Sequence, residues 1–461
     1  FSGGMRQRVV ISLALCCEPE LLIADEPTTA LDVSIQSQIL DLIKRLTKER
    51  NLAVILITHD MGVISETTSR VAVMKNGDLV EIGPTKEILT KPKEIYTKAL
   101  VSSVPPTNKK INRFKIIEKE NKTQGETNIK ILNRWTKKDI IDQDLVKVKN
   151  LCKTFDDNFF TESTKNSVMA VDDVSFNIKE GESFGLVGES GSGKSTIAKM
   201  IVNLYSPSAG DIDFDNVCIT KIKSNKEMMK FRKQIQMIFQ DPYSSLNGRL
   251  KVKDIVAEPL IANHDVSDKE RDRKVAEAME LVGLSPDQAN NYPHEFSGGQ
   301  RQRIAVASAL VASPKLIILD EPVSALDVSI RAQVMNLLVD LQETHNLSYL
   351  LIAHNLATVR YMAHQTAVMY LGEIVEYGNT EELFQEPLHP YTKALFSASL
   401  PSHPDLIHEE IVLTGEVPSP INPPKGCHFH PRCPFAMDKC SVEVPEEKEI
   451  SPGYKVSCHL Y

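Results

Sequence analysis

Short apolar segments alternate with longer amphipathic segments along most of the chain. Residues 21–24, 53–57 and 316–319 are continuous apolar runs of strand length. Residues 35–49 and 330–344 instead place their apolar side chains at the spacing of one helical face. Because strands and helices alternate in this way, we expect a parallel β-sheet covered by helices, which is an α/β fold.

The chain also repeats itself over a long stretch. The sequence FSGGMRQR, which starts at Phe1, recurs as FSGGQRQR at Phe296, an offset of 295 positions. The same offset relates three further pairs, namely Asp25 and Asp320, His59 and His354, and Leu100 and Leu395. Stacked repeat units have periods of about 20–50 residues, so this much longer period indicates the duplication of a whole domain.

The repeat and the local composition divide the chain into four parts. Residues 1–107 are expected to be the C-terminal part of a first domain, and residues 145–402 a complete second domain. Between them, residues 108–144 are rich in Lys, Asn, Thr, Glu and Asp, which predicts a polar linker. Residues 403–461 form a C-terminal extension that contains prolines and four cysteines. Because the chain begins inside the repeated motif, we expect a truncated N-terminus.

Bulk composition argues against two classes of protein. The apolar runs are far shorter than the roughly 20 residues that a membrane-spanning helix needs. The formal net charge of -8 argues against a protein that binds nucleic acids through a general basic surface. A chain with 42% hydrophobic and 25% charged residues is instead typical of globular domains.

The strongest chemical motif is a glycine-rich loop between a predicted strand at residues 183–187 and a predicted helix at residues 197–203. It consists of Gly188, Glu189, Ser190, Gly191, Ser192, Gly193, Lys194, Ser195 and Thr196. Such a loop turns successive backbone N–H groups toward phosphate oxygens, and the following helix N-terminus adds partial positive charge. We expect Lys194 to reach the β- and γ-phosphates of a nucleotide, Ser195 to bind Mg²⁺, and Thr196 to lie near the α-phosphate.

Further polar residues follow predicted strands downstream of this loop. The apolar run at residues 316–319 ends on Asp320 and Glu321, at the strand end that lies beside the loop in such sheets. We expect Asp320 to bind Mg²⁺ through water and Glu321 to act as general base for an attacking water. His354 and Gln240 also follow predicted strands, and we expect His354 to orient that water and Gln240 to contact the water or the metal ion.

The order of these motifs resembles the nucleotide-binding domain of ABC transporters. It comprises the phosphate loop, Gln240, the signature residues Ser297, Gly298 and Gly299, then Asp320, Glu321, Asp327 and His354. Residues 240–247, 293–299 and 387–395 are similar to the ATPases of oligopeptide, dipeptide and nickel importers. Two such domains in one chain resemble the tandem forms, glutathione-type peptide importers included. The resemblance implies a P-loop NTPase fold with a helical subdomain, ATP as nucleotide and Mg²⁺ as cofactor.

Members of that family hydrolyse ATP between two domains that close head to tail. The resemblance therefore implies a complete composite site in which the phosphate loop faces Ser2, Gly3 and Gly4, with Asp32 lying across the interface. A second site would combine Asp25 (a Mg²⁺ partner), Glu26 and His59 with Ser297, Gly298 and Gly299, and its phosphate loop would precede Phe1. The resemblance also implies that adenine stacks on Phe155, with Phe159 and Phe160 close by.

Four of the eight cysteines lie in the C-terminal extension, at Cys427, Cys433, Cys440 and Cys458. Five, six and seventeen residues separate them, which does not match the short CxxC pairs of structural zinc sites. A 4Fe-4S cluster accepts wider spacing, and some peptide-importer ATPases carry one in a similar tail. A cluster is the favoured hypothesis, and zinc and free thiols are the alternatives.

The function implied by the resemblance is ATP hydrolysis that powers the import of peptides, with a nickel or metal-chelate importer as the alternative. Two permease subunits and an extracytoplasmic substrate-binding protein would be separate chains, and the ATPase would lie at the cytoplasmic face of a bacterial membrane. A tandem ABC protein that acts on ribosomes or DNA is the competing class. The acidic charge and the importer-like tail argue against it, so we expect no nucleic-acid partner.

Overall fold

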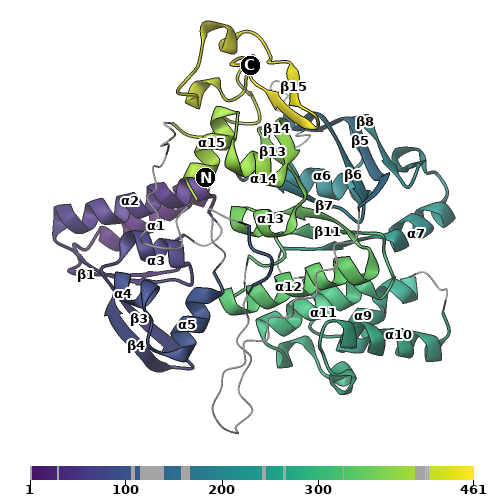
Figure 1. The fold of residues 1–461 in the computed structure, drawn as a ribbon, viewed down its shortest axis with the longest axis horizontal. Coiled ribbons are helices and arrows are strands. Elements are labelled where there is room, and N and C mark those ends of the chain that lie inside the picture. The colour runs from purple at the N-terminus through teal and green to yellow at the C-terminus, as the bar shows by residue number, and fades with distance from the viewer. Residues whose placement is uncertain are drawn as a thin grey trace.

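The computed structural model describes residues 3–28, 31–104, 110–114, 140–156, 167–240, 245–262, 266–324, 326–399, 411, 413 and 415–461. Within these ranges the chain forms two blocks of alternating strands and helices and a smaller C-terminal block, each drawn in its own colours in Figure 1. The α/β fold predicted from the alternation of apolar and amphipathic segments is confirmed.

An eight-stranded sheet is the centre of the second block, and its strands lie in the order β10-β11-β12-β7-β13-β14-β16-β15. The strands from β10 to β13 in this order are parallel, and β14, β16 and β15 follow in antiparallel pairs. Their bounds are β7 (Ser183–Val187), β10 (Ile235–Ile238), β11 (Leu316–Asp320), β12 (Ser348–Ile352), β13 (Gln365–Tyr370), β14 (Glu373–Asn379), β15 (Glu447–Ser451) and β16 (Tyr454–Ser457). The last two strands belong to the C-terminal extension, which therefore continues the main sheet.

A second, antiparallel sheet has the order β6-β5-β8-β9. It consists of β5 (Ile141–Asp156), β6 (Ser167–Glu180), β8 (Ala209–Phe214) and β9 (Val217–Cys218). Phe176 of β6 stacks on Phe184 of β7 with 4.7 Å between the ring centroids. The two sheets therefore share one apolar core.

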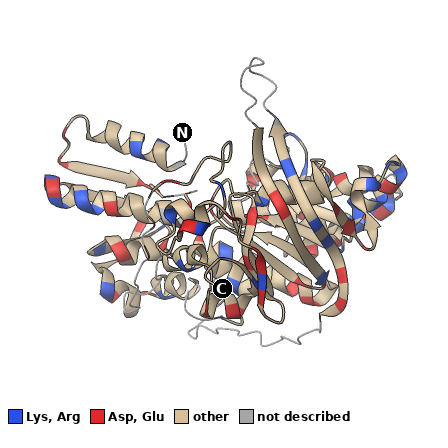
Figure 2. Cartoon of the chain, turned by 90° about the horizontal axis from the view of Figure 1, so that it is seen from above, with Lys and Arg blue, Asp and Glu red and all other residues tan. Residues whose placement is uncertain are grey.

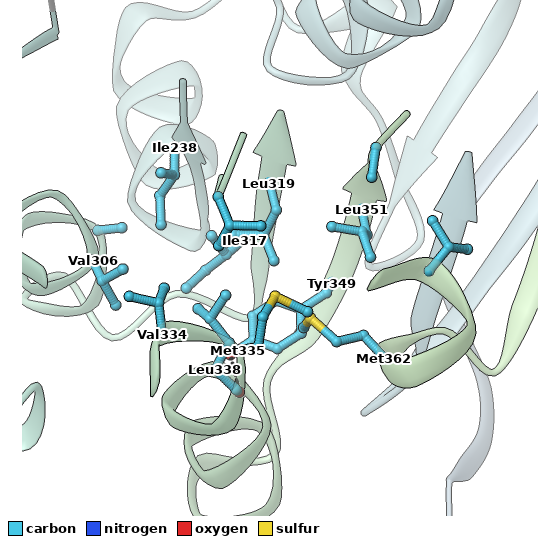
Figure 3. Packing of buried hydrophobic residues seen from close by; sticks show 14 of the residues in the cluster. Ile238, Val306, Ile317, Leu319, Val334, Met335, Leu338, Tyr349, Leu351 and Met362 are labelled. Carbon is cyan, nitrogen blue, oxygen red and sulfur yellow. Dashed lines mark hydrogen bonds between the residues drawn. The ribbon is translucent and has the colours of Figure 1, made fainter. Parts of the chain in front are cut away.

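Helices cover the main sheet and form a separate group at one end of the block (Figure 1). They are α6 (Lys194–Ile201), α7 (Asn225–Gln234), α9 (Val252–Ala262), α10 (Asp268–Leu281), α11 (Gly298–Leu310), α12 (Val328–His345), α13 (Leu356–Met362), α14 (Thr380–Gln385) and α15 (Pro390–Ser397). Short 3-10 turns are η1 (Ile219–Lys221), η2 (Pro286–Asn290), η3 (Pro293–Glu295), η4 (His430–Arg432) and η5 (Asp438–Ser441). Figure 3 shows side chains of α12 and α13, such as Met335 and Met362, packed around Tyr349 of β12.

The first block repeats the second half of this arrangement. Its elements are α1 (Gly3–Leu15), β1 (Leu21–Asp25), α2 (Val33–Arg50), β2 (Ala53–Ile57), α3 (Met61–Thr67), β3 (Arg70–Lys75), β4 (Asp78–Pro84), α4 (Thr85–Thr90) and α5 (Ile95–Ser102). Each begins and ends 295 positions before its counterpart between α11 and α15. The strands form two separate pairs, parallel β1-β2 and antiparallel β3-β4. The duplication read from the sequence is thus a duplication of structure.

Part of the segment expected to be a polar linker packs against the second block. Phe114 is 5% exposed and lies edge-on to Tyr361 of α13, with 4.5 Å between the ring centroids. The Arg113 guanidinium donates two hydrogen bonds to the Asp340 carboxylate, at 2.5 and 2.6 Å. Arg113 and Phe114 of the expected linker therefore pack against the second block, and β5 of that block begins at Ile141, inside the same expected linker.

Charged residues of both signs are distributed along the fold. Figure 2 shows Lys and Arg interspersed with Asp and Glu along the described elements of both blocks. Among the residues that the structure describes, no helix is long and apolar enough to cross a membrane.

Candidate functional site

The glycine-rich loop follows β7, a fully buried strand between β12 and β13. Gly188 and Gly193 have φ angles of +148° and +104°, and a Cβ atom there would lie 2.2 and 2.3 Å from a backbone oxygen. Only glycine accommodates that backbone and that approach. The loop leads directly into α6, which begins at Lys194, and this strand–loop–helix arrangement is the one that a phosphate site requires.

Lys194 is buried at the centre of the loop. Its Nζ donates hydrogen bonds to the backbone oxygens of Gly188 (2.8 Å) and Glu189 (2.7 Å) and to the Ser192 Oγ (3.1 Å). Burial lowers the pKa of Lys194, although nearby carboxylates oppose the shift. The predicted phosphate-binding lysine is thus oriented by the loop that carries it.

Ser195 and Asp320 meet beside the loop. The Ser195 hydroxyl donates to the Asp320 Oδ1 at 3.2 Å, across 125 positions of sequence. Burial raises the pKa of Asp320, and the hydrogen bond from Ser195 opposes this. Hydroxyl and carboxylate oxygens are the ligands that Mg²⁺ prefers, so the pair predicted to hold Mg²⁺ has suitable chemistry.

Glu321 lies at the centre of a cluster of three predicted catalytic residues. Its Oε2 accepts a hydrogen bond from the Gln240 Nε2 (2.6 Å) and lies 3.1 Å from the His354 Nδ1. Burial raises the pKa of Glu321, but the hydrogen bond and charge of His354 outweigh it, and the pKa lies below its ordinary value. The φ of +50° at Glu321 is in the left-handed region, which few non-glycine residues adopt. An ionised carboxylate held by two neighbours can accept a proton from water.

The first repeat has the same local geometry with more exposure. The His59 Nδ1 lies 2.8 Å from the Glu26 Oε1, and Glu26 has a φ of +44°. The Glu26 side chain is 42% exposed, compared with 18% for Glu321. Asp25, which ends β1, is exposed, whereas its counterpart Asp320 is buried.

Asp32 connects the first repeat to the phosphate loop of the second. Its Oδ1 accepts a hydrogen bond from the Ser190 backbone N–H at 2.7 Å. Burial raises the pKa of Asp32, and the charge of Lys194 opposes the shift. The equivalent residue of the second repeat, Asp327, is exposed at the start of α12.

The signature residues of the second repeat begin α11. The Ser297 Oγ accepts a hydrogen bond from the Gln300 backbone N–H (3.4 Å), and the Gln300 side chain accepts one from the Ser297 N–H (3.0 Å). This reciprocal capping box fixes the start of the helix at Gly298. A Cβ atom at Gly299 would lie 2.2 Å from the Ile330 side chain, so this glycine is also needed for the packing of α11 on α12.

The first signature copy is similar where it is described. Ser2 lies outside the described residues, and Gly3 begins α1. A Cβ atom at Gly4 would lie 2.6 Å from the Ile35 side chain, which matches the contact at Gly299. The two copies differ at Met5, which stands where the second repeat has Gln300.

Phe155, the residue expected to stack on adenine, lies near the end of β5 and is 36% exposed. Its ring is edge-on to Tyr205 at 5.4 Å, and the Lys153 Nζ lies 5.0 Å from its centroid. Phe159 and Phe160 lie outside the described residues. Thr196 is partly buried in the first turn of α6.

The four cysteines of the extension border one small cavity, together with Phe429 and His459. They are Cys427, Cys433, Cys440 and Cys458, and all are free thiols. Burial raises the pKa of Cys427 to about 11. In the part of the chain that the structure describes, no three His, Cys, Asp or Glu side chains are grouped to hold a metal ion. No metal-binding geometry among these residues therefore supports the favoured 4Fe-4S cluster or the alternative zinc ion, although the four thiols border one cavity.

Sequence reasoning missed a contact between the extension and the phosphate loop. Arg432 forms a buried ion pair with Glu189, and the Tyr391 hydroxyl accepts a hydrogen bond from the Glu189 backbone N–H at 2.9 Å. Arg432 lies 243 positions from Glu189 and belongs to no phosphate-binding motif. No local pattern in the sequence therefore points to it.

Three family models match the chain. The model described as ABC transporter matches residues 171–324, and the model described as the oligopeptide/dipeptide transporter C-terminal region matches residues 80–130 and 375–440. A model described as AAA domain, putative AbiEii toxin, Type IV TA system, matches residues 2–65. The oligopeptide/dipeptide transporter model matches both repeats. Its first match extends to residue 130, into the segment that we expected to be a linker.

Curated relatives match nearly the whole chain. The glutathione import ATP-binding protein GsiA of Escherichia coli (strain K12) is 45% identical over 429 residues, which cover 91% of this chain and 68% of that protein. GsiA of Shigella flexneri gives the same values.

Among solved structures, cbiO1 from Clostridium perfringens, part of the ABC transporter complex cbiONQ, is 31% identical with a TM-score of 0.46. The match covers 53% of this chain and 92% of that chain. A dimeric post-hydrolysis state of the ATP-binding cassette MJ0796 bound to ADP and Pi is 32% identical with a TM-score of 0.45, over 51% of this chain and 98% of that chain.

Proposed function

The chain belongs to the ATP-binding proteins of ABC transporters, in the oligopeptide/dipeptide importer group, and we propose that its ATPase reaction powers the import of small peptides. Peptides of the glutathione type are the favoured cargo, because the GsiA relatives are glutathione import proteins by name and match 91% of the chain. The observation that carries the proposal is the convergence of Lys194, Asp320 and Glu321 around one intact phosphate loop.

At this site the loop residues Gly188 to Thr196 bind the phosphates of ATP through their backbone N–H groups. Lys194 exchanges its bonds to the loop oxygens for phosphate oxygens. Ser195 and Asp320, together with Gln240, would hold Mg²⁺, and the ion would neutralise negative charge on the phosphates.

Proton transfer is assigned to Glu321. Water adds to the γ-phosphorus, the bond to the bridging oxygen of ADP breaks, and the water proton passes to the Glu321 carboxylate. His354 and Gln240 hold this carboxylate and orient the water. Phe155 stacks on the adenine, and its exposed ring near the end of β5 supports this assignment.

Pairing of the two repeats completes the site. The hydrogen bond between Ser190 and Asp32 supports a head-to-tail arrangement in which Ser2, Gly3 and Gly4 complete the phosphate shell. By the same logic Ser297, Gly298 and Gly299 would face Asp25, Glu26 and His59. Domains at residues 1–107 and 145–402 are the units that open and close, and residues 403–461 form the extension.

The cysteine cavity is a separate hypothesis. The four thiols around one cavity support a 4Fe-4S cluster more than a single zinc ion, because an ion needs all its ligand atoms within about 2.3 Å of one point. Iron and acid-labile sulfide should be measured on protein purified without oxygen. About four irons per chain would support the cluster, and metal-free protein with four alkylatable thiols would refute it.

Import requires partners that lie outside this chain. We propose two permease subunits, an extracytoplasmic substrate-binding protein, and a peripheral position at the cytoplasmic face of a bacterial membrane. In cells that carry only Glu321→Gln, uptake of labelled glutathione or dipeptides should be lost while ATP stays bound. Loss of nickel uptake with normal peptide uptake would favour the metal-importer alternative. Co-purification with ribosomes in place of membrane proteins would overturn the importer assignment.

A further inference from the structure

The C-terminal extension contacts the phosphate loop through one buried ion pair. The Arg432 Nη1 lies 2.7 Å from the Glu189 Oε2, and the Arg432 Nη2 lies 3.2 Å from the Glu189 Oε1. The two side chains are only 3% and 2% exposed. A planar guanidinium that binds both oxygens of a carboxylate fixes its orientation as well as its position.

The backbone of Glu189 also forms hydrogen bonds with two other parts of the site. Its backbone N–H donates to the Tyr391 hydroxyl of α15 (2.9 Å), and its backbone oxygen accepts from the Lys194 Nζ (2.7 Å). The same residue therefore joins the extension, α15 and the phosphate-binding lysine. A shift of its side chain would move the backbone that holds Lys194.

Arg432 is itself fixed by the extension. It ends the turn η4, and its neighbour Phe429 is 1% exposed and packs on Tyr370 and Tyr391. Cys433 follows directly and borders the cysteine cavity. The packing of Phe429 on these two tyrosines therefore fixes the position of Arg432 beside the phosphate loop.

We propose that Arg432 is a positioning residue for ATP binding, so that the C-terminal extension is a required part of the nucleotide site. The proposal rests on the function assigned above to the Lys194 loop. Without Arg432, the buried Glu189 carboxylate would lose the two-point contact that holds it beside the position of the ATP phosphates. A buried carboxylate that loses its cation either distorts the loop or repels the nucleotide.

The test measures the ATP dissociation constant of the full chain by calorimetry with MgATP. Arg432→Met should weaken binding at least roughly tenfold, because it removes the cation that balances a buried carboxylate. Arg432→Lys, which keeps the charge and loses the two-point contact, should weaken it roughly threefold to tenfold. Arg432→Met with Glu189→Gln removes both charges and should restore binding to within about threefold of the wild type.

A matched control is Lys439→Met, which removes an exposed cation of the same extension whose Nζ donates a hydrogen bond to the His459 backbone oxygen at 3.3 Å. This variant should bind ATP as the wild type does. At saturating ATP, the turnover of Arg432→Lys should change much less than its apparent KM, because Arg432 does not reach the reacting atoms.

Two outcomes would overturn the inference. Wild-type affinity in Arg432→Met would show that the contact does not position the loop. Equal weakness in Arg432→Met and the double variant would show that Arg432 only maintains the fold of the extension. The proposed nucleotide site fails separately, if Lys194→Ala binds ATP as tightly as the wild type.

Discussion

The two repeats share every helix and strand from α1 to α5, yet their central strands differ in burial. Ile23 of β1 and Ile55 of β2 are 61% and 50% exposed. Their counterparts Ile318 and Leu350 in the second repeat are fully buried. The same apolar pattern therefore forms the same strands in both repeats, but other elements bury the strands only in the second repeat.

The difference comes from elements that the described part of the first repeat lacks, β7 and α6 among them. In the second repeat β7 pairs with both β12 and β13 and joins them into one sheet. In the described part of the first repeat nothing corresponds to β7, and β1-β2 and β3-β4 remain separate pairs. Because β7 leads directly into the phosphate loop, the segment that binds nucleotide is also the segment that completes the core.

The largest expected difference between the repeats is in catalysis. Glu321→Gln should lower ATP hydrolysis by roughly 10²–10⁴-fold, which is the usual contribution of a general base. Glu26→Gln should change it less than about threefold in this chain, because Glu26 has no phosphate loop beside it among the described residues. Phosphate release at saturating MgATP measures both. Equal losses would mean that the repeats contribute equally to the reaction.

A second difference is expected in stability. Ile318→Ala should lower the free energy of unfolding by about 3 kcal/mol, because it leaves a cavity between packed strands and helices. Ile23→Ala, at the matched position, should change it by no more than about 0.5 kcal/mol. Urea unfolding followed by circular dichroism measures both variants at one protein concentration. A large loss in Ile23→Ala would show that another surface covers β1 in solution.

Local motifs made most of the site predictable from the sequence. The phosphate loop needs only a strand, its own glycines and a helix start, so its geometry is encoded within a few neighbouring residues. The ends of parallel strands lie at one edge of a sheet, and this brings Asp320, Glu321 and His354 together without any knowledge of their contacts. Asp32 was expected at the interface through the family resemblance alone, and its carboxylate lies against Ser190.

The contacts that sequence reasoning missed join distant parts of the chain. Arg432 and Glu189 are 243 positions apart, and the Phe114 N–H lies 222 positions from the Asn336 side chain to which it donates a hydrogen bond. No helical or strand period connects such pairs, and each looks like an ordinary polar or apolar residue in its own segment. The pairing of β16 with β14 was missed for the same reason, because a short strand in a polar tail gives no local signal.

A smaller effect is expected where the two signature helices begin. Gln300→Met removes the hydrogen bond from the Ser297 N–H and should lower the stability of the second repeat by about 1 kcal/mol. The reciprocal change Met5→Gln introduces the same side chain into the first repeat and should add up to about 0.5 kcal/mol. Thermal unfolding of both variants tests this. A loss in Met5→Gln would mean that Met5 packs in a way that glutamine cannot replace.

The smallest difference concerns two equivalent carboxylates, Glu81 and Glu376. Each accepts hydrogen bonds from two backbone N–H groups, Lys93 and Glu94 in the first repeat, and Leu388 and His389 in the second. The Thr97 hydroxyl and the two backbone N–H groups lower the pKa of Glu81, which is half-buried. Burial raises the pKa of Glu376, which the Tyr454 hydroxyl of the extension covers with a 2.6 Å hydrogen bond.

The two carboxylates should therefore respond to pH in opposite directions. Because folding lowers the pKa of Glu81, its carboxylate stabilises the fold above pH 4.5, and this stabilisation is lost as the pH falls through the folded-state pKa. Glu81→Gln should therefore lower the free energy of unfolding more at pH 7 than at pH 4. Because folding raises the pKa of Glu376, its protonated carboxyl stabilises the fold below pH 4.5, and this stabilisation is lost as the pH rises through the folded-state pKa. Glu376→Gln should therefore lower the free energy of unfolding more at pH 4 than at pH 7. Unfolding of both variants and the wild type at the two pH values gives the sign of each change. Changes of the same sign would mean that the cover supplied by Tyr454 does not persist in solution, and the two repeats would then be electrostatically alike at this position.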